Sequence, residues 1–542
     1  MTRRLLAFFA VFLVSLAVRG GSVPVIPQTD GYMTSLAHHV VRWFAQESVP
    51  AELVEASRMK TKLSQARVAV LIGFDKPTSD DRAAITGFLR RGGKLIVLYS
   101  ASPELAAMMG VRQLGFRKAA APGLWSRMDF AANAPEGCPA AIRQTSSVLL
   151  RAEPLPGKGR VLATWSDRQG TAHGDAAWIA TTSGFWMTHV LTADGDEDLK
   201  ARMLASFAGF VDPTLWCARD AVERERTDKR ALRAYALAQR PRTGEIRAVW
   251  DHSGCGLYPG DWARTIRLLK ESGVTDVFVN VAGAGFAHYP SDVLPRSKTF
   301  YDEGDQLAAC LAAAHDAGIR VHAWILCFTA TRSTPDRLEV FRRNGWRIKT
   351  HNGRLTEYLD PSNPAVRAHL LSAIDEIRDN YRVDGVHLDF VRWYEDADKP
   401  RDAADVITRF VADARRHVRR PLWLTTAVLA GYPACVRNVG QDWWTWIDAN
   451  LVDYVVPMGY TEDSARFDRF ASVYAASRGH ACRTIAGVGV TANESRLDAR
   501  KVIDQITIAR RHGLAGVSLF DLDVTLEKSI LPYLRLGLWK TP

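Results

Sequence analysis

Short apolar runs and amphipathic segments alternate regularly through the second half of the chain. Segments 261–273, 305–318 and 364–381 place apolar side chains at helical spacing. Eight strand-like apolar runs surround them, at 245–251, 274–282, 319–328, 383–391, 422–429, 452–460, 484–490 and 516–523. Eight strand-then-helix units over about 300 residues predict a (β/α)8 TIM barrel.

The first half of the chain has a less regular pattern. Apolar runs at 67–75 and 94–102 flank a helical segment at 79–93, whose candidate N-cap is Ser79. A strand, a helix and a strand joined by short loops indicate a parallel βαβ unit. Residues 124–192 are richer in strand-like runs. We therefore expect a smaller flavodoxin-like α/β domain before the barrel.

The length of 542 residues is too great for one ordinary domain. A segment dense in charge and alanine, 213–243, predicts a solvated connecting helix between the two halves. The expected organisation is a signal peptide at 1–19, an accessory α/β domain at 23–212, the connecting helix, and the barrel at 244–542.

The N-terminus has the pattern of a secretory signal. Arg3 and Arg4 precede an apolar run at 5–18 that only Ser15 interrupts, and Ser15-Leu16-Ala17 supplies a small-residue cleavage site. The run is short for a membrane span, so we expect cleavage, with an uncleaved signal anchor as the alternative. The protein is then exported to the periplasm, the cell envelope or the medium, and it meets a membrane only through this segment.

The amino-acid composition argues against several kinds of ligand and cross-link. Apolar residues make up 47% and charged residues 24%, as in globular proteins. The net charge of +11 is spread along the chain without a basic run that interleaves aromatics, which argues against nucleic acid. The seven cysteines are odd in number and form no CxxC pair, so neither a disulfide framework nor a zinc site is expected. We expect no cofactor and no metal.

Acidic and aromatic residues gather where the predicted barrel strands end. In this fold the active site lies at the C-terminal ends of the strands. The candidates there are Asp251, Asn280, Trp324, Asp389, Arg392, Trp393, Tyr394, Tyr460, Glu462 and Asp521. Aromatic faces stack on sugar rings, and carboxylates bind hydroxyls and transfer protons, so this combination suits a glycan site.

Asp389 is the leading candidate for a catalytic carboxylate, as a nucleophile or a general base. Its alternative role is a helix cap or an ion pair with Arg392. Glycoside cleavage needs a second carboxyl group. We favour Glu462 as the general acid, and Asp251, Asp521, Asp523 and Glu395 compete for that role. Trp324, Trp393, Tyr394 and Tyr460 are candidate sugar platforms, Asn280 is a candidate partner for a sugar hydroxyl, and His322 is expected to be a core residue.

Several stretches of the second half resemble a known family. They are EIRAVWDHSG (245–254), AHYPSDVLPRS (287–297), AAHDAGIRVHAWI (313–325) and the long block 358–393, which contains VDGVHLDFVRW. Together they resemble the glycosyl-hydrolase-like 10 family of bacterial envelope proteins over roughly residues 245–535. The resemblance implies a TIM-barrel glycoside hydrolase that acts on an extracellular or cell-wall polysaccharide. The DGVHLD segment is also similar to the strand-four acid of family 18 chitinases.

The first half loosely resembles ThuA-like and class I glutamine-amidotransferase-like domains. That resemblance implies a cysteine nucleophile at a strand-to-helix elbow. Here Ser100-Ala101-Ser102 follows the second apolar run and no cysteine is near. We therefore interpret residues 23–212 as a non-catalytic accessory or binding domain, with a serine hydrolase as the alternative.

The leading functional hypothesis is an exported glycosidase that cleaves a polysaccharide or the glycan strands of peptidoglycan with two carboxylates. The runner-up is a carbohydrate-binding barrel on the cell surface without hydrolytic activity, and a third is a scaffold whose first domain binds a partner. A carboxylate close to Asp389 favours the enzyme, whereas an isolated Asp389 locked to Arg392 favours binding. The sugar, the linkage, the anomeric outcome and the oligomeric state stay open.

Overall fold

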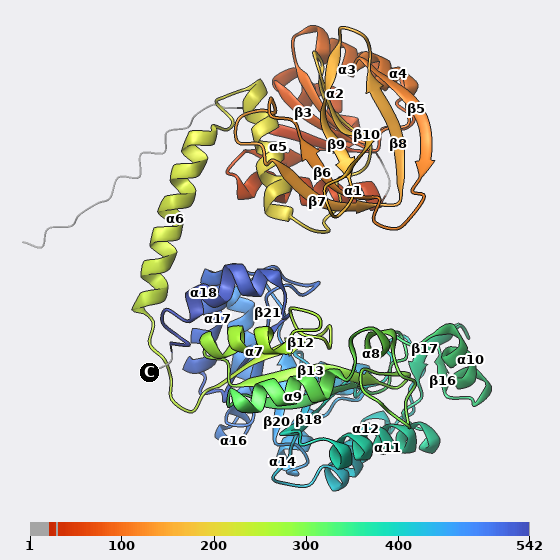
Figure 1. Cartoon of the computed structure of the whole chain (residues 1–542), viewed down its shortest axis with the longest axis vertical. Helices are drawn as coiled ribbons and strands as arrows, with labels where there is room; N and C mark the ends of the chain where they lie inside the picture. Colours follow the sequence, from red (N-terminus) through yellow and green to blue (C-terminus); the bar gives the residue numbers. More distant parts are fainter. Residues whose placement is uncertain (1–20, 29–30, 541–542) are drawn as a thin grey trace, which may run out of the picture. The chain divides into compact units, whose positions relative to one another are not determined.

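A computed structural model describes residues 21–28 and 31–540, and the chain divides into two compact units, Met1–Thr227 and Asp228–Pro542 (Figure 1). The expected signal peptide lies outside the described residues. Among those residues, no helix is both long and apolar enough to cross a membrane.

The first unit is built on a nine-stranded sheet in the order β2-β1-β3-β4-β11-β10-β9-β6-β7. Its parallel part comprises β2 (Ala51–Leu53), β1 (Val23–Pro27), β3 (Val68–Ile72), β4 (Lys94–Leu98) and β11 (Gly184–Met187). Its antiparallel part comprises β10 (Ala172–Thr181), β9 (Gly159–Ser166), β6 (Trp125–Phe130) and β7 (Ala141–Ser146). The order of the parallel strands is flavodoxin-like, as expected.

Helices and a strand ribbon complete the first unit. The helices are α1 (Gly31–Gln46), α2 (Met59–Gln65), α3 (Ser79–Arg90), α4 (Pro103–Met108) and α5 (Glu197–Val211). The N-cap of helix α3 is Thr78, one residue before the predicted cap Ser79, because Thr78 and Asp81 form a reciprocal capping box. Strands β5 (Val111–Lys118) and β8 (Val148–Pro154) pair antiparallel as a separate ribbon.

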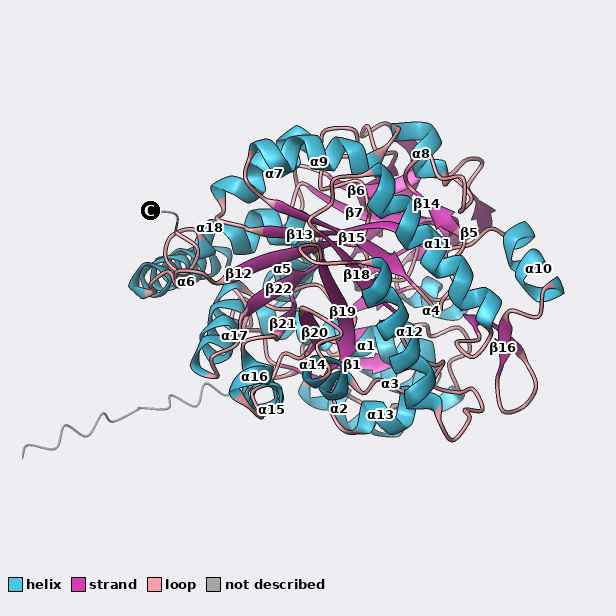
Figure 2. Cartoon of the chain, turned by 90° about the horizontal axis from the view of Figure 1, so that it is seen from below, coloured by secondary structure: helices cyan, strands magenta, loops and turns pink. Residues whose placement is uncertain are grey.

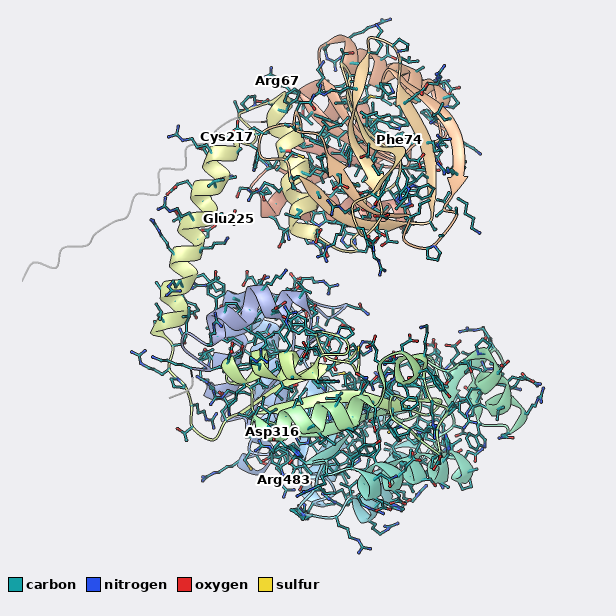
Figure 3. The ribbon with its side chains drawn as sticks, in the orientation of Figure 1. Arg67, Phe74, Cys217, Glu225, Asp316 and Arg483 are labelled. Carbon is teal, nitrogen blue, oxygen red and sulfur yellow. The ribbon has the colours of Figure 1, made fainter. Side chains whose placement is uncertain are left out.

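The two serines that follow β4 are occupied by structural hydrogen bonds. Ser100 is fully buried and its hydroxyl donates to the carbonyl of Phe74, which lies in the interior of this unit (Figure 3). Ser102 is also buried and caps α4, since its hydroxyl oxygen accepts from the Leu105 amide at 3.2 Å. Neither hydroxyl is exposed, in keeping with a non-catalytic role for this pair.

The second unit contains a closed parallel barrel. Its strands run in the order β12-β22-β21-β20-β19-β18-β15-β13, and pairing of β12 with β13 closes the ring. The strands are β12 (Ile246–Asp251), β13 (Asp276–Gly283), β15 (Arg320–Leu326), β18 (Gly385–Asp389), β19 (Trp423–Leu429), β20 (Tyr454–Met458), β21 (Ile485–Gly489) and β22 (Gly516–Phe520). Each lies within one of the eight predicted runs, except that β13 extends one residue past its run, so the predicted TIM barrel is confirmed.

Helices surround the ring of strands, as Figure 2 shows for α7 (Trp262–Glu271), α9 (Gln306–Asp316), α11 (Pro364–Asn380), α12 (Ala403–His417) and α17 (Ala499–Arg511). Helix α6 (Ala218–Ala238) covers the segment where the two units divide. An insertion after β15 holds α10 (Pro335–Arg343) and the hairpin of β16 (Arg347–Lys349) and β17 (Leu355–Leu359). Further short elements are β14 (Phe286–Ala287), α8 (Lys298–Glu303), α13 (Ala434–Val439), α14 (Trp443–Asp448), α15 (Ser464–Tyr474), α16 (Arg478–Ala481) and α18 (Leu531–Leu534).

Aromatic rings and a neutral histidine fill the barrel interior. The Trp250 indole donates to His387 Nε2 at 3.0 Å, which leaves the proton on Nδ1 to donate to Thr425 Oγ1 at 2.8 Å. Phe278 stacks on the His387 ring at 4.3 Å. Burial lowers the pKa of His387 well below its ordinary value, so the ring is uncharged. This packed layer forms a floor two residues below Asp389 on the same strand.

A buried ion pair braces the opposite end of the barrel. The fully buried Asp276 accepts from Arg320 at 2.7 Å and from His322 Nε2 at 2.9 Å, so His322 is the core residue that the sequence predicts. Burial alone raises the pKa of Asp276, but His322 and Arg320 outweigh it and hold that pKa below its ordinary value.

Asp276→Asn is therefore expected to destabilise the protein by about 3 kcal/mol, because it leaves a buried histidine and an arginine without their anion. Denaturant unfolding near pH 7 measures this loss, with the exposed Asp316→Asn as the control. Equal midpoints for the two variants would contradict the bracing role.

Candidate functional site

Asp389 ends β18 at the C-terminal mouth of the barrel. Its side chain is 7% exposed, and Oδ1 accepts from the Phe390 amide at 2.6 Å. Burial raises the pKa of Asp389, while Arg392, the Phe390 amide and the Trp324 indole act against that rise. Phe390 itself has a φ of +52°, which is uncommon for an aromatic residue and is the kind of backbone strain that collects at functional sites.

A second carboxyl group, Asp521, directly follows β22 in the chain. Its Oδ1 accepts from the backbone amides of His252 at 3.1 Å and Leu522 at 2.7 Å. Burial, with smaller contributions from Asp251 and Asp523, outweighs these bonds and raises the pKa of Asp521 to about 7. Asp521 is thus about half protonated near neutral pH, the state that suits a general acid.

Tyr460 packs among the aromatic rings of the mouth. Burial raises the pKa of the Tyr460 hydroxyl well above its ordinary value, and the negative charges of Asp389, Glu494 and Asp521 raise it further. The Tyr460 ring stacks on Phe520 with centroids 5.4 Å apart. The centroid of the His252 ring lies 5.9 Å from that of Phe520 and 5.8 Å from that of Trp324. The mouth therefore combines two carboxyl groups with an aromatic wall.

Two other predicted site residues serve the surrounding structure. Asp251 is fully buried, where it accepts from the Ser253 hydroxyl and the Gly256 amide. Residues alternate between the two faces of a strand, so with Trp250 inside the barrel Asp251 points to the helical layer and orders the loop after β12. The fully buried Asn280 donates to the Trp324 carbonyl at 3.3 Å. The structure thus assigns Asp251 and Asn280 supporting roles in place of the predicted sugar contacts.

Glu462 has contacts of its own. Its carboxylate accepts from the Arg496 amide at 2.9 Å and lies 3.6 Å from Lys501 Nζ. The Glu462 carboxylate is therefore engaged by the segment that carries Arg496 and Lys501. The role of general acid that the sequence analysis favours for Glu462 stays a prediction, and Asp521 is the acid at this mouth whose pKa is raised to about 7.

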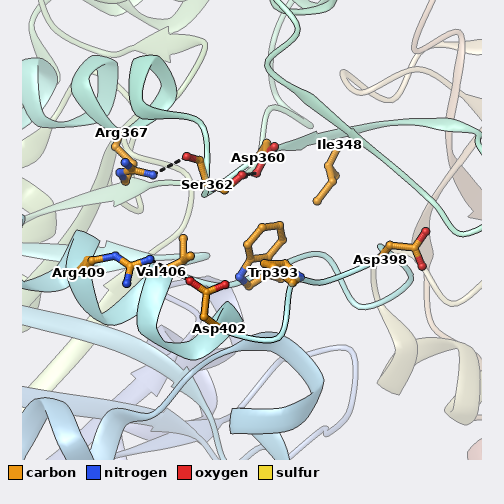
Figure 4. Close-up of a pocket in the computed structure, with 10 residues that line it drawn as sticks. Ile348, Asp360, Ser362, Arg367, Trp393, Asp398, Asp402, Val406 and Arg409 are labelled. Carbon is orange, nitrogen blue, oxygen red and sulfur yellow. Dashed lines mark hydrogen bonds and ion pairs between the residues drawn. The ribbon is translucent and has the colours of Figure 1, made fainter.

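Trp393 and Tyr394 extend away from the carboxyl groups. Trp393 is only 3% exposed, and its indole donates to the Ala403 carbonyl at 3.1 Å. It lines a separate cavity of about 410 Å³ bordered by Asp360, Arg367, Asp398, Asp402 and Arg409 (Figure 4). The Tyr394 ring stacks on the Tyr358 ring with centroids 4.3 Å apart. Trp393 is therefore a buried wall residue, and Tyr394 belongs to an aromatic pair beside Phe390.

Sequence reasoning missed several residues of the mouth and its floor. Trp250 and His387 sit two residues before His252 and Asp389, and strict alternation along the strands identifies both as inward. Arg332, from the loop after β15, donates to Asn280 Oδ1 and lies 4.5 Å above the Phe286 ring. No sequence pattern marks that loop. Within 21–28 and 31–540, no group of three or more histidine, cysteine, aspartate or glutamate side chains is placed to hold a metal ion.

The chain matches known proteins over this part of the barrel. Residues 245–405 match the family model described as Glycosyl hydrolase-like 10. Those residues belong to the glycosyl hydrolase-like 10 family. The family match supports a glycosidase-type role for the barrel. The resemblance of the first unit to ThuA-like domains stays a prediction.

Relatives named Glycosyl hydrolase DigH, from Escherichia coli (strain K12) and Shigella flexneri, are 32% identical over 142 residues. The match covers 22% of this chain and spans 31% of the length of those relatives. Among solved structures, alpha-L-fucosidase isoenzyme 2 from Paenibacillus thiaminolyticus matches with a TM-score of 0.37 and 11% identity over 54% of this chain and 48% of its own. The beta-amylase catalytic domain from Paenibacillus polymyxa matches with a TM-score of 0.38 and 10% identity over 51% of this chain and 92% of its own.

The raised pKa of Asp521 has a consequence for stability. Its folded-state pKa of about 7 lies above the ordinary value of 3.8, so folding favours the protonated form. That contribution is fully present at low pH and is lost as the pH rises from about 4 through 7. Asp521→Asn is therefore expected to be more stable than the unsubstituted protein at pH 8, by about 1–2 kcal/mol, and no more stable at pH 4. Denaturation midpoints at both pH values measure the difference, and a pH-independent difference would contradict the raised pKa.

Proposed function

We propose that this protein is an exported glycoside hydrolase that cleaves O-glycosidic bonds of a bacterial cell-wall or extracellular polysaccharide, with Asp389 and Asp521 as its carboxylate pair. The observation that carries the proposal is the presence of two carboxyl groups at the C-terminal mouth of the barrel, with Asp389 as the last residue of β18 and Asp521 directly after β22. A pair of carboxyl groups at this place in the fold is what glycoside cleavage requires.

The surroundings of the two carboxyl groups suggest different roles. Asp521, with a pKa of about 7, supplies a proton to the glycosidic oxygen as the bond breaks. Burial raises the pKa of Asp389, while Arg392 Nη1 at 3.9 Å and the Phe390 amide act in favour of its anion. The Asp389 carboxylate then attacks the anomeric carbon or removes a proton from the attacking water. Trp324, Tyr460 and Phe520 offer ring faces to the sugar.

The carbohydrate-binding alternative requires an isolated Asp389 held by Arg392. The Arg392–Asp389 contact is a long one, at 3.9 Å, and Asp521 provides a second carboxyl group at the same mouth. Both observations support the hydrolase. Export rests on the N-terminal sequence pattern alone.

The test is to incubate the purified protein with a panel of bacterial polysaccharides, including peptidoglycan glycan strands, and to measure new reducing ends. The matched blank is the protein with both Asp389→Asn and Asp521→Asn. Release above the blank from at least one polymer supports the hydrolase. Binding of a polymer without release from any of them overturns it in favour of the binding protein.

A further inference from the structure

Arg332 is held at the barrel mouth by uncharged groups. Its Nη1 donates to Asn280 Oδ1 and, at 3.4 Å, to the His252 carbonyl. Its guanidinium carbon lies 4.5 Å above the Phe286 ring. These contacts fix the position of the guanidinium beside the loop that carries His252, while the residue as a whole stays exposed to solvent.

His288 is neutral and accepts from Arg332. Burial and the charge of Arg332 lower the pKa of His288 to about 4. Its Nε2 lies 3.4 Å from Arg332 Nη2, and its Nδ1 lies 2.6 Å from Ser297 Oγ. Because Nε2 faces a cation that only donates, the ring proton sits on Nδ1 and is donated to Ser297. His288 therefore brings no negative charge to Arg332.

Arg332 has no carboxylate partner within ion-pairing distance in the described parts of the chain, 21–28 and 31–540. Three arginines that brace the barrel elsewhere have such a partner. Arg320 pairs with Asp276 at 2.7 Å, Arg415 with Asp453 at 2.6 Å, and Arg510 with Glu245 at 2.6 Å. The guanidinium of Arg332 is thus held in place without such an ion pair, and the negative charge of the buried Asp251 acts on it only from beyond ion-pairing distance.

Arg392 adds a second incompletely satisfied cation to the mouth. Its side chain is 15% exposed, its Nη1 is buried without a hydrogen-bond partner, and that atom is 3.9 Å from Asp389. A buried donor left without a partner costs free energy that a ligand acceptor recovers. Two arginines with spare donors at one mouth point to a ligand that carries negative charge.

We propose that the mouth selects an acidic glycan, and that Arg332 binds a carboxylate or sulfate group on one of its sugars. The planar guanidinium offers paired N–H donors whose spacing matches the oxygens of such a group. The Phe286 ring packs against one face of the guanidinium, and Asn280 Oδ1 accepts a hydrogen bond from its Nη1. The Arg332 side chain is therefore already ordered and loses little conformational freedom when a ligand binds. The inference rests on the proposed function for the cleavage step but concerns recognition.

The test measures affinity with the full chain carrying Asp521→Asn, so that cleavage does not consume the probe. The probes are peptide-free peptidoglycan glycan strands, the same strands after chemical reduction of their carboxyl groups, dextran sulfate, and dextran. Adding Arg332→Gln is expected to weaken binding of the unreduced strands about tenfold or more, the scale of hydrogen bonds to a charged group. The affinity of the Arg332→Lys protein should lie between those of the Arg332 and Arg332→Gln proteins, since lysine keeps the positive charge but lacks the paired N–H donors of the guanidinium.

The matched control is Arg343→Gln. Arg343 lies at the end of α10, paired with Glu339, and its loss changes the net charge by the same amount. If the Arg332 effect appears only with dextran sulfate, the recognised group is a sulfate. Equal affinity of the Arg332→Gln and Arg343→Gln proteins for all four probes would overturn the proposal.

Failure of this inference is distinguishable from failure of the proposed function. Reducing ends released by the unsubstituted protein, with no dependence of binding on Arg332, overturn only acidic-glycan selection. Arg332-dependent binding with no release from any polymer overturns only the hydrolase.

Discussion

Asp521→Asn is expected to slow hydrolysis of a polysaccharide by about a hundredfold or more at pH 7, because it removes the group that protonates the departing sugar oxygen. The loss should depend on the leaving group. A dinitrophenyl glycoside of the same sugar needs little proton assistance, so its hydrolysis should fall by about tenfold or less. Initial rates on the two substrates provide the comparison.

Glu462→Gln is the control that separates the structural assignment from the sequence prediction. Glu462 binds the Arg496 amide and Lys501, and its removal should cost less than tenfold on either substrate. A large, leaving-group-dependent loss in Glu462→Gln, with a small one in Asp521→Asn, would return the role of general acid to Glu462.

Asp389→Asn is expected to slow hydrolysis of the polysaccharide at least as much as Asp521→Asn does, by about a thousandfold. Its dependence on the leaving group should differ, because a nucleophile or base acts on the anomeric centre whichever group departs. The dinitrophenyl glycoside should therefore be hydrolysed as poorly as the polymer, relative to the unsubstituted protein. Circular dichroism and glycan affinity of the variant establish that the fold and the binding site survive.

A rate on the dinitrophenyl substrate that stays near that of the unsubstituted protein would contradict this role for Asp389. The ion pair with Arg392 would then be its main function. Arg392 lies over the Phe390 ring at 4.1 Å, so that pair alone could order the loop that follows β18.

The fold of the second unit was predictable because each barrel strand is a buried apolar run bounded by turn residues. Parallel strands covered on both faces leave that signal in the sequence. Strand β5, which lies outside the strand-rich stretch predicted at 124–192, was missed because its side chains are mixed and mostly exposed, with Phe116 at 64% exposed. Segment length and periodicity carry little information where one face of a strand meets water and pairing is long-range.

The site was only partly predictable. Asp389 could be found because it ends a strand, and the aromatic residues Trp324 and Tyr460 follow the same rule. The choice among the other acids depended on burial and on backbone amides from distant segments. The His252 amide reaches Asp521 across 269 residues of sequence, and no local pattern encodes that contact. Alternation along β12 did hold usable information, since it orients Asp251 away from the mouth once Trp250 points inward.

The pH dependence of kcat/KM for reducing-end release, measured for the unsubstituted protein and for Asp389→Asn and Asp521→Asn, tests the central claim most directly. The account predicts a bell-shaped profile whose alkaline limb, with an apparent pKa near 7, reports protonated Asp521, and whose acidic limb reports ionised Asp389. Asp521→Asn should lose the alkaline limb alone, and Asp389→Asn the acidic limb alone. An alkaline limb that survives in Asp521→Asn, or no release by the unsubstituted protein at any pH, would contradict it.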